Sequence, residues 1–576
     1  MPTQKLTLDF LRTQLIGADA TFSTPYGDRL MVYCDYTASG RCLKFVESYL
    51  QDLQKIYANT HTEDDITGRS MTRLLHDAEE SIKRSVNAGP DGRIVAVGTG
   101  ATGAIDKFQQ IVGVALPPAT RSNLLKLLDQ FDGEEKRAAF NRFLAEHQPI
   151  VFVGPYEHHS NELTWKEGLA TVVEVRLNDD GGIDMAHLES LLQDPAYQNR
   201  MRIGSFSAAS NVTGYKTDVH AVARLLHQYG AVAAFDFAAC APYVEIDMNP
   251  DDGHGGASAL DAIFISPHKF LGGPGSSGVL VFNKRIYRED LPPSVSGGGT
   301  VAWVSSNFHA FVDSIEEREK AGTPGVLQTL KAALAFQIKD RIGADTITNR
   351  EHELNVRAFD RWSQHPNIEI LGNPDPERRV GIVSFNIRDK EGSYLHPKFV
   401  TALLNDLFGI QSRAGCSCAG PYGHKLLGID ADRSNDFWEA VQEGHCGMKP
   451  GWCRVGLHYV LDDAEADYVI DAVRFVADYG CRFLSHYDFD LATGAWSNKR
   501  EAPPLRRFSL DAALDAVNAP EDAHLTMAVR RQLYDHYLAE AKRIADEYAH
   551  EHHERGKLTG EVAKLQFFAV APSRDL

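Results

Sequence analysis

The sequence predicts an α/β protein whose large domain holds a mostly parallel sheet. Apolar runs alternate with helical stretches from Arg93 to Phe282, a pattern typical of strands joined by crossover helices. The chain has 576 residues, of which 43% are hydrophobic and 24% charged. It is therefore long enough to bury more than one core, and a smaller α/β domain is expected after the large one.

The strands of the large domain are predicted from apolar runs that each end at a small or polar residue. Such ends are turn signals. The runs are residues 93–97, 149–153, 202–206, 230–235 and 261–265. We expect this domain to span residues 41–322, with a charged helical insertion at 115–148.

The remaining segments are predicted from changes in pattern. Residues 1–40 are expected to pack with the small α/β domain, which covers 323–489 and includes an apolar strand at 380–387. Residues 490–576 form a carboxy-terminal extension, with a proline-containing linker at 501–504 followed by a charged helical run. The sequence assigns this extension no function.

Lys269 is the residue that points most directly to chemistry. It lies between the predicted strand 261–265 and the glycine-rich turn 270–278, and it follows a histidine. A lysine that is partly desolvated there can lose its proton and form a Schiff base with an aldehyde cofactor. The sequence therefore suggests pyridoxal phosphate, although a surface lysine after a strand is the alternative for Lys269 taken alone.

Two further strand ends supply groups that such a cofactor needs. Asp236 ends the run 230–235, where a carboxylate can hold the ring nitrogen protonated. The segment 98–105 follows the strand 93–97 and opens a helix, whose backbone amides can bind a phosphate. His158 and Asn211, after two other strands, offer an imidazole that can stack on the ring and an amide that can reach its hydroxyl.

The joint order of these motifs resembles class V fold-type I pyridoxal-phosphate enzymes, over about residues 30 to 480. That group comprises cysteine desulfurases, selenocysteine lyases and the amino-terminal domain of molybdenum cofactor sulfurases. The resemblance implies an α/β fold-type I transferase architecture. It also implies which residues hold the cofactor: Ala101, Thr102, His158, Asn211, Asp236, Ser266, His268 and Lys269. One departure is Ala239, where many desulfurases carry a glutamine that contacts the ring hydroxyl.

The same resemblance implies a substrate-facing loop and a homodimer. Residues 33–39 resemble the opening strand and loop of the family, which makes Ala38 a substrate-binding candidate. Residues 297–300 and 319–325 resemble segments that cross a dimer interface. Thr323 is therefore expected to bind the phosphate held by the neighbouring subunit, so that the active site needs two chains.

Cys418 is the residue that selects among the reactions of this group. It lies in the glycine-flanked stretch 412–421, close in sequence to Arg413, where a cation can stabilise a thiolate. In the desulfurases a loop cysteine takes the sulfur of the substrate as a persulfide, and Cys418 aligns with it. The Cys-x-Cys form resembles the molybdenum cofactor sulfurase branch. Cys416 either relays the persulfide or is structural.

Arg454 is the candidate for binding the substrate carboxylate, because its segment 451–457 resembles the family strand that carries this arginine. A guanidinium fork suits a carboxylate. Arg413 is a second substrate-binding candidate. No metal is expected, because the spacings of Cys416, Cys418 and the nearby histidines match no common zinc pattern.

Charge and composition exclude several classes of function. The net charge of −19 argues against general nucleic-acid binding. No apolar run is long enough to cross a membrane, and the first residues lack the apolar core of a signal peptide. Eight cysteines in a chain of this length indicate a reducing, cytoplasmic location.

These observations predict a cytoplasmic, homodimeric pyridoxal-phosphate enzyme that removes sulfur or selenium from cysteine or a related amino acid. By the resemblance, Lys269 carries the cofactor and moves protons, while Cys418 passes sulfur to a thiol or an acceptor protein. Two alternatives stay open. One is transamination, epimerisation or C–S β-elimination on another amino acid. The other is a scaffold that no longer catalyses.

Overall fold

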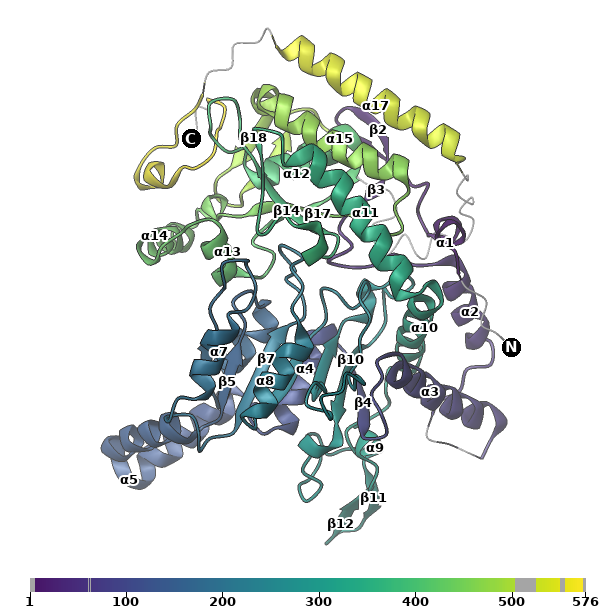
Figure 1. The fold of residues 1–576 in the computed structure, drawn as a ribbon, viewed down its shortest axis with the longest axis vertical. Coiled ribbons are helices and arrows are strands. Elements are labelled where there is room, and N and C mark those ends of the chain that lie inside the picture. Colours follow the sequence, from purple (N-terminus) through teal and green to yellow (C-terminus); the bar gives the residue numbers. More distant parts are fainter. Residues whose placement is uncertain (1–5, 61, 63, 503–524, 550–554, 573–576) are drawn as a thin grey trace. The chain divides into compact units, whose positions relative to one another are not determined.

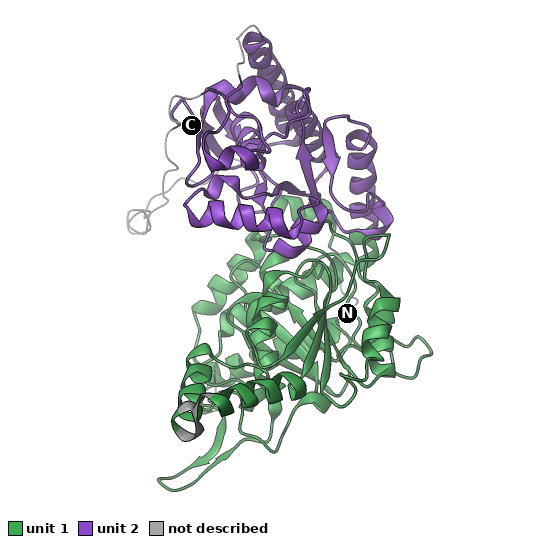
Figure 2. Ribbon diagram, turned by 90° about the vertical axis from the view of Figure 1, so that its left-hand side faces the viewer, with its two compact units in different colours: residues 1–14, 37–348 green, residues 15–36, 349–576 purple. Residues whose placement is uncertain are grey.

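A computed structural model describes residues 6–60, 62, 64–502, 525–549 and 555–572. The chain divides into two compact units (Figure 2). Unit 1 comprises residues 1–14 and 37–348, and unit 2 comprises 15–36 and 349–576. Pro503 and Pro504 of the predicted linker lie outside the described residues.

Unit 1 is built on a seven-stranded sheet with the strand order β4-β10-β9-β8-β7-β5-β6 (Figure 1). The strands from β9 to β6 run parallel, whereas β10 is antiparallel to both of its neighbours. The bounds are β4 Gly92–Val97, β5 Ile150–Val153, β6 Thr171–Glu174, β7 Arg202–Ser207, β8 Val232–Asp236, β9 Ala262–Ile265 and β10 Gly278–Asn283. The mostly parallel sheet predicted from the sequence is therefore present.

The central strands of this sheet are apolar throughout because helices cover them. All four residues of β5 and of β9 are buried, as expected for a parallel sheet covered on both faces. Helix α4 (Gly100–Ile111) packs on β9 and β10 through Ala104, Ile105 and Phe108, which are fully buried.

Other helices of unit 1 complete the covering. Helix α10 packs on α3 and α2, so residues 326–342 belong to the core of this unit. The bounds are α1 Leu8–Gln14, α2 Lys44–Gln54, α3 Ile66–Ser85, α5 Pro118–His147, α6 Leu163–Lys166, α7 Met185–Leu192, α8 Val219–Gln228, α9 Ile315–Arg318 and α10 Val326–Ile342. The long helix α5 lies within the segment expected to be a helical insertion.

A short hairpin projects from the body of unit 1 (Figures 1 and 2). It consists of β11 (Val301–Val304) and β12 (His309–Phe311). Trp303 and Phe308 are 63% and 62% exposed, respectively. Large apolar side chains at a projecting tip are unusual for a surface that faces water alone.

Unit 2 contains a four-stranded antiparallel sheet with the order β13-β14-β17-β16. Its strands are β13 Ile368–Ile370, β14 Ile382–Ile387, β16 Arg413–Gly415 and β17 Trp452–Gly456. Three two-stranded pairs complete the strands: β1 Thr21–Thr24 with β2 Gly27–Leu30, β3 Val32–Tyr33 with β15 Ile410–Gln411, and β18 Tyr487–Asp490 with β19 Ala495–Asn498. Its helices include α12 Pro397–Phe408, α13 Gly420–Leu426, α14 Ala431–Gln442, α15 Asp463–Tyr479 and α17 Met527–Tyr548, and α11 (Ala344–Trp362) carries the unit boundary.

The carboxy-terminal extension contributes to the core of unit 2. Tyr534, Tyr537 and Ala541 of α17 are buried in the same apolar cluster as the small sheet. The ring of Tyr534 stacks on Tyr468 of α15, with centroids 4.4 Å apart. Helix α17 is therefore an integral layer of this unit.

None of the helices described is both long and apolar enough to pass through a bilayer.

Candidate functional site

Lys269 ends a single 3-10 turn, η2 (Pro267–Lys269), directly after the buried strand β9. Its backbone N–H donates to Ser266 O at 3.0 Å, and its side chain is half-buried. Strand β9 thus fixes the position of the Lys269 backbone, while the side chain keeps some access to solvent.

The segment that contains Ala38 runs against this turn. Gly40 N–H donates to His268 O at 2.9 Å, and a Cβ on Gly40 would lie 2.0 Å from Phe270 O. Only glycine permits such an approach of two backbones. The structure therefore places the predicted substrate residue Ala38 beside the lysine turn.

Asp236 ends β8 as a buried carboxylate, 4% exposed. Its Oδ1 accepts from Ala238 N–H at 2.8 Å. Burial raises the pKa of Asp236, and the Ala238 hydrogen bond and the charge of Lys269 oppose this shift. A cation next to this carboxylate would stabilise its ionised form, as a protonated ring nitrogen does.

The first turn of α4 meets the lysine turn at Gly100. Ala101 N–H donates to Ser266 Oγ at 2.9 Å. Gly100 has φ +59°, and a Cβ there would lie 2.8 Å from His268 Cε1. Burial, together with the charge of Lys269, lowers the pKa of His268 to about 4, so this imidazole is neutral at physiological pH.

Ser160 links the α4 segment to His158. Its Oγ lies 2.7 Å from Thr102 Oγ1 and 3.1 Å from His158 Nδ1. The Ser160 N–H also donates to His158 Nδ1 at 3.1 Å, which makes Nδ1 an acceptor and leaves the proton on Nε2. The structure thus joins three side chains from the two segments predicted to hold the phosphate and the ring.

Glu157 ties the ends of two neighbouring strands together. Its carboxylate accepts from Gly154 N–H after β5 at 3.1 Å and from Ser207 N–H at the end of β7 at 2.8 Å. It also accepts from Ser207 Oγ at 2.6 Å and Asn161 Nδ2 at 2.7 Å. Burial raises the pKa of Glu157 to about 7 against these hydrogen bonds. Glu157 thereby fixes the backbone next to His158.

Asn211 and Thr323 lie in two other loops of unit 1. Asn211 is 7% exposed in the loop after β7, where Ala208 N–H donates to Asp236 O at 2.8 Å. Thr323 is exposed before α10. Gly322 N–H donates to Gly298 O at 2.8 Å, so the two segments expected at a dimer interface are joined to each other.

Cys418 lies in unit 2, in the turn between β16 and α13. Both Cys416 and Cys418 are exposed. Ser417 and Cys418 have φ +52° and +56°, a left-handed conformation that costs free energy in a residue with a Cβ. The strain and the exposure together suit a thiol that reacts and changes position.

Arg413 and Arg454 are directly opposite each other on the paired strands β16 and β17. Both bind Asp35: Arg413 Nε lies 3.0 Å from Oδ2, and Arg454 Nη2 lies 3.1 Å from Oδ1. The side chain of Arg454 is only 4% exposed, whereas that of Arg413 is 49% exposed. A carboxylate is thus already seated on the two predicted carboxylate-binding residues.

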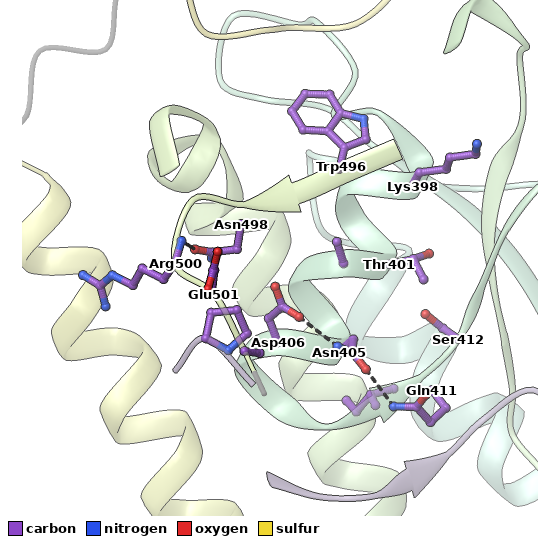
Figure 3. A pocket seen from close by; sticks show the side chains of 14 residues that line it. Lys398, Thr401, Asn405, Asp406, Gln411, Ser412, Trp496, Asn498, Arg500 and Glu501 are labelled. Carbon is purple, nitrogen blue, oxygen red and sulfur yellow. Dashed lines mark hydrogen bonds between the residues drawn. The ribbon is translucent and has the colours of Figure 1, made fainter. Parts of the chain in front are cut away.

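A pocket of about 590 Å³ in unit 2 contains none of the predicted site residues (Figure 3). It is lined by side chains of α12, β15 and β19. Three of its polar side chains bond to one another, since Gln411 Nε2 donates to Asn405 Oδ1 at 2.9 Å and Asn405 Nδ2 donates to Asp406 Oδ1 at 2.8 Å (Figure 3). These hydrogen bonds point to no particular ligand.

Three residues of these clusters were missed by reasoning from the sequence. Glu157 and Ser160 flank the His-His pair. Their position shortly after a predicted strand is the sequence feature that could have indicated them. Asp35 lies 419 positions before Arg454 in the chain. No local pattern indicates that pairing, because it depends on the folding of unit 2.

The residues of unit 1 fit pyridoxal phosphate. A lysine, a buried carboxylate and a neutral imidazole are present, and α4 begins without a side-chain cap from Thr99, so its first turn can accept an anion. Lys269 would hold the aldehyde carbon and Asp236 the ring nitrogen. Ala101, Thr102, Ser266 and His268 would hold the phosphate, and His158 the ring face.

Comparison with known proteins identifies the relatives of this chain. A family model described as Aminotransferase class-V matches residues 138–469, more than half of the chain. The protein named "Probable cysteine desulfurase" from Staphylococcus aureus strain Mu50 is 29% identical over 72% of this chain and 88% of its own length. A protein of the same name from Streptomyces coelicolor is 26% identical over 68% of this chain and 84% of its own.

Solved structures share the fold. A cysteine desulfurase from Thermococcus onnurineus has a TM-score of 0.62 at 20% identity. The match covers 83% of this chain and 99% of that chain. The cysteine desulfurase CsdA from Escherichia coli has a TM-score of 0.59 at 20% identity, covering 81% and 98%. The predicted fold class, fold-type I with a large mostly parallel sheet, is confirmed, and so is the resemblance to this group of enzymes.

Proposed function

Because the chain belongs to the aminotransferase class-V family, whose members are pyridoxal-phosphate enzymes, we propose that it is a cysteine desulfurase. Its substrate is L-cysteine or a related sulfur or selenium amino acid. The observation that carries the proposal is Cys418, an exposed cysteine in a strained turn that follows the arginine-bearing strand β16. The names of the relatives support the same reaction.

The cofactor, when bound, supplies an aldehyde that condenses with amines and a ring that withdraws electrons. Lys269 holds it and then moves a proton at Nζ. Asp236 keeps the ring nitrogen protonated, and His158 covers the ring face. Arg454 binds the substrate carboxylate, with Arg413 and Ala38 beside the substrate.

Cys418 accepts the sulfur. Its thiolate forms an S–S bond to the substrate sulfur as the C–S bond breaks, and the carbon gains a proton. L-cysteine and the Cys418 thiol therefore become alanine and a Cys418 persulfide, so atoms and electrons balance. A thiol or an acceptor protein then removes the outer sulfur. Cys416, which lies two residues before Cys418, is a second exposed thiol.

We also propose a cytoplasmic homodimer in which Thr323 acts on the phosphate of the partner. The exposed hairpin with Trp303 and Phe308, together with the joined Gly298 and Gly322 segments, supports a surface for a second copy. All eight cysteines are free thiols, which supports a reducing compartment. Mixing Lys269→Ala and Thr323→Ala proteins tests the exchange: activity should reappear only in mixed dimers.

The deciding experiment incubates the cofactor-loaded protein with L-cysteine and a thiol reductant and quantifies alanine, sulfide and pyruvate. Equal amounts of alanine and sulfide are expected. Lys269→Ala should lose both products and the yellow colour, and Cys418→Ser should lose turnover but keep the colour. Cys446→Ser, a half-buried cysteine outside these clusters, is the matched control and should behave as wild type.

Other products would overturn the proposal. Pyruvate with sulfide would assign a C–S β-lyase, and an active Cys418→Ser protein would remove the persulfide role. A loaded protein that forms no product from L-cysteine would exclude desulfuration of this substrate and favour transamination or epimerisation of another amino acid.

A further inference from the structure

Asp35 lies between the two arginines predicted to bind the substrate carboxylate, and no local pattern assigns it a role. We propose that Asp35 is a positioning residue, which holds the guanidinium of Arg454 in the orientation that reads an amino-acid carboxylate. The inference rests on the proposed function, because Arg454 is the substrate-binding residue only there.

The backbone holds Asp35 firmly on both sides. Cys34 N–H donates to Gln411 O at 2.9 Å, and Gly456 N–H donates to Cys34 O at 2.7 Å. On the other side, the ring of Tyr36 stacks on His458, with centroids 4.0 Å apart and an interplanar angle of 24°. The Asp35 carboxylate is therefore aimed from a fixed point of the fold.

Arg454 needs this carboxylate because it is buried. Its side chain is 4% exposed, and a guanidinium with so little water is costly without a counter-charge. The opposing residue Arg413 is also a cation, and like charges directly across two strands repel each other. Asp35 offsets this repulsion, since it bonds to Arg454 with Oδ1 and to Arg413 with Oδ2.

The guanidinium of Arg454 offers more donors than this one contact with Asp35 uses. Asp35 takes Nη2 of Arg454, and a guanidinium carries five donors in a rigid plane. Two arginines and one aspartate carry one net positive charge, which matches a single carboxylate. A guanidinium held in place before binding loses less side-chain entropy when the substrate arrives.

The test measures ligand binding as well as turnover. Cofactor-loaded protein is titrated with L-alanine, which has the carboxylate but no sulfur, and with L-alaninamide, which lacks the carboxylate. Asp35→Asn is expected to raise the Kd of L-alanine about tenfold and the KM for L-cysteine likewise, with kcat changed less than about twofold. The Kd of L-alaninamide should stay unchanged.

Asp19→Asn is the matched control. Asp19 pairs with the buried Arg530 in the same unit, and the exposures of the two pairs are alike: 11% and 8% against 14% and 4%. This variant removes a comparable ion pair and should leave both ligand affinities unchanged. Asp35→Glu keeps the charge at a shifted position and should raise the Kd of L-alanine about threefold, which carries the test if Asp35→Asn does not fold.

The outcomes separate this inference from the proposed function. Unchanged or tighter L-alanine binding in folded Asp35→Asn or Asp35→Glu would overturn the positioning role, because Asp35 would then be inert or a competitor. Equal affinity of the wild-type protein for L-alanine and L-alaninamide would show that Arg454 does not bind the substrate carboxylate, and would overturn this inference as well. Normal L-alanine binding without turnover of L-cysteine would overturn the desulfurase assignment and leave the role of Asp35 standing.

Discussion

Ser266 Oγ accepts a hydrogen bond of 2.9 Å from the backbone N–H of Ala101, and this contact joins the lysine turn to the first turn of α4. The two residues are 165 positions apart in the chain. Their contact fixes the distance between the proposed phosphate site and Lys269. Under the proposed function, Ser266 would therefore both bind the cofactor phosphate and shape the site that holds it.

Ser266→Ala should weaken cofactor retention about tenfold, because one hydrogen bond to an anion and one to Ala101 N–H are lost. The measurement is the yellow colour that remains after dialysis at a series of cofactor concentrations. Ser190→Ala, an exposed serine on α7, is the control and should bind as wild type. Equal retention in both variants would remove Ser266 from the phosphate site.

Gly278→Ala should displace the first turn of α4. A Cβ on Gly278 would lie 2.3 Å from Gly100 O and 2.5 Å from Gly100 Cα, and backbone atoms cannot rotate away. We expect a loss of stability of about 1–3 kcal/mol and a loss of cofactor binding greater than that of Ser266→Ala. Chemical denaturation and cofactor titration measure the two effects.

Gly204→Ala is the comparison for that variant. A Cβ there, on strand β7, meets Leu226 Cδ1 at 2.5 Å, which is the flexible end of a side chain on helix α8. It should lower stability while the cofactor is retained. Retention of the cofactor by Gly278→Ala as well would show that the α4 turn does not bind it.

The ion pair of Arg29 with Glu540 anchors the carboxy-terminal helix α17. Arg29 is 3% exposed, its Nη2 lies 2.8 Å from Glu540 Oε2, and its guanidinium lies 4.8 Å from the ring centroid of Tyr537. Glu540→Gln should lower the free energy of unfolding by about 2 kcal/mol, because a buried cation loses its counter-charge. Urea denaturation measures this change.

Glu547→Gln provides the contrast on the same helix. Its pair with Arg543 is exposed at 57% and 60%, so solvent screens it and the expected loss is below about 0.5 kcal/mol. Equal effects of the two substitutions would contradict the anchoring role of Glu540.

His396 makes the stability of unit 2 depend on acid. Its Nδ1 accepts from Lys398 N–H at 3.1 Å and its Nε2 donates to Gly447 O at 3.2 Å, so the folded state holds a neutral ring. Burial lowers the pKa of His396 from 6.5 to about 4. The unfolded state then binds the proton more readily than the folded state. The contribution of the neutral His396 ring to the unfolding free energy is therefore complete above pH 6.5 and is lost as pH falls toward 4.

Between pH 6.5 and pH 4 the unfolding free energy is expected to fall by about 3 kcal/mol because of His396. Trp496, whose ring centroid lies 5.9 Å from that of His396, reports it by fluorescence during urea denaturation. In His396→Gln the pH dependence of the unfolding free energy should be flatter by this amount. The same slope in both proteins would assign the acid sensitivity to other groups.

The sequence by itself determined the local parts of this protein. Lys269 after β9, Asp236 at the end of β8 and the glycine turn before α4 follow from strand and turn patterns that span a few residues. Such patterns are set by burial and backbone geometry within one segment. The fold class and the order of the site segments were accessible for that reason.

Only the tertiary structure decided which distant groups meet. Asp35 reaches Arg454 because β3 lies beside β15 and because Gly456 admits the backbone of Cys34. Likewise, the charged sequence of the extension does not indicate that α17 packs against Arg29 through Glu540 and Tyr537. Contacts between residues hundreds of positions apart depend on how whole elements pack, since the hydrophobic effect that drives packing is non-directional and names no partner.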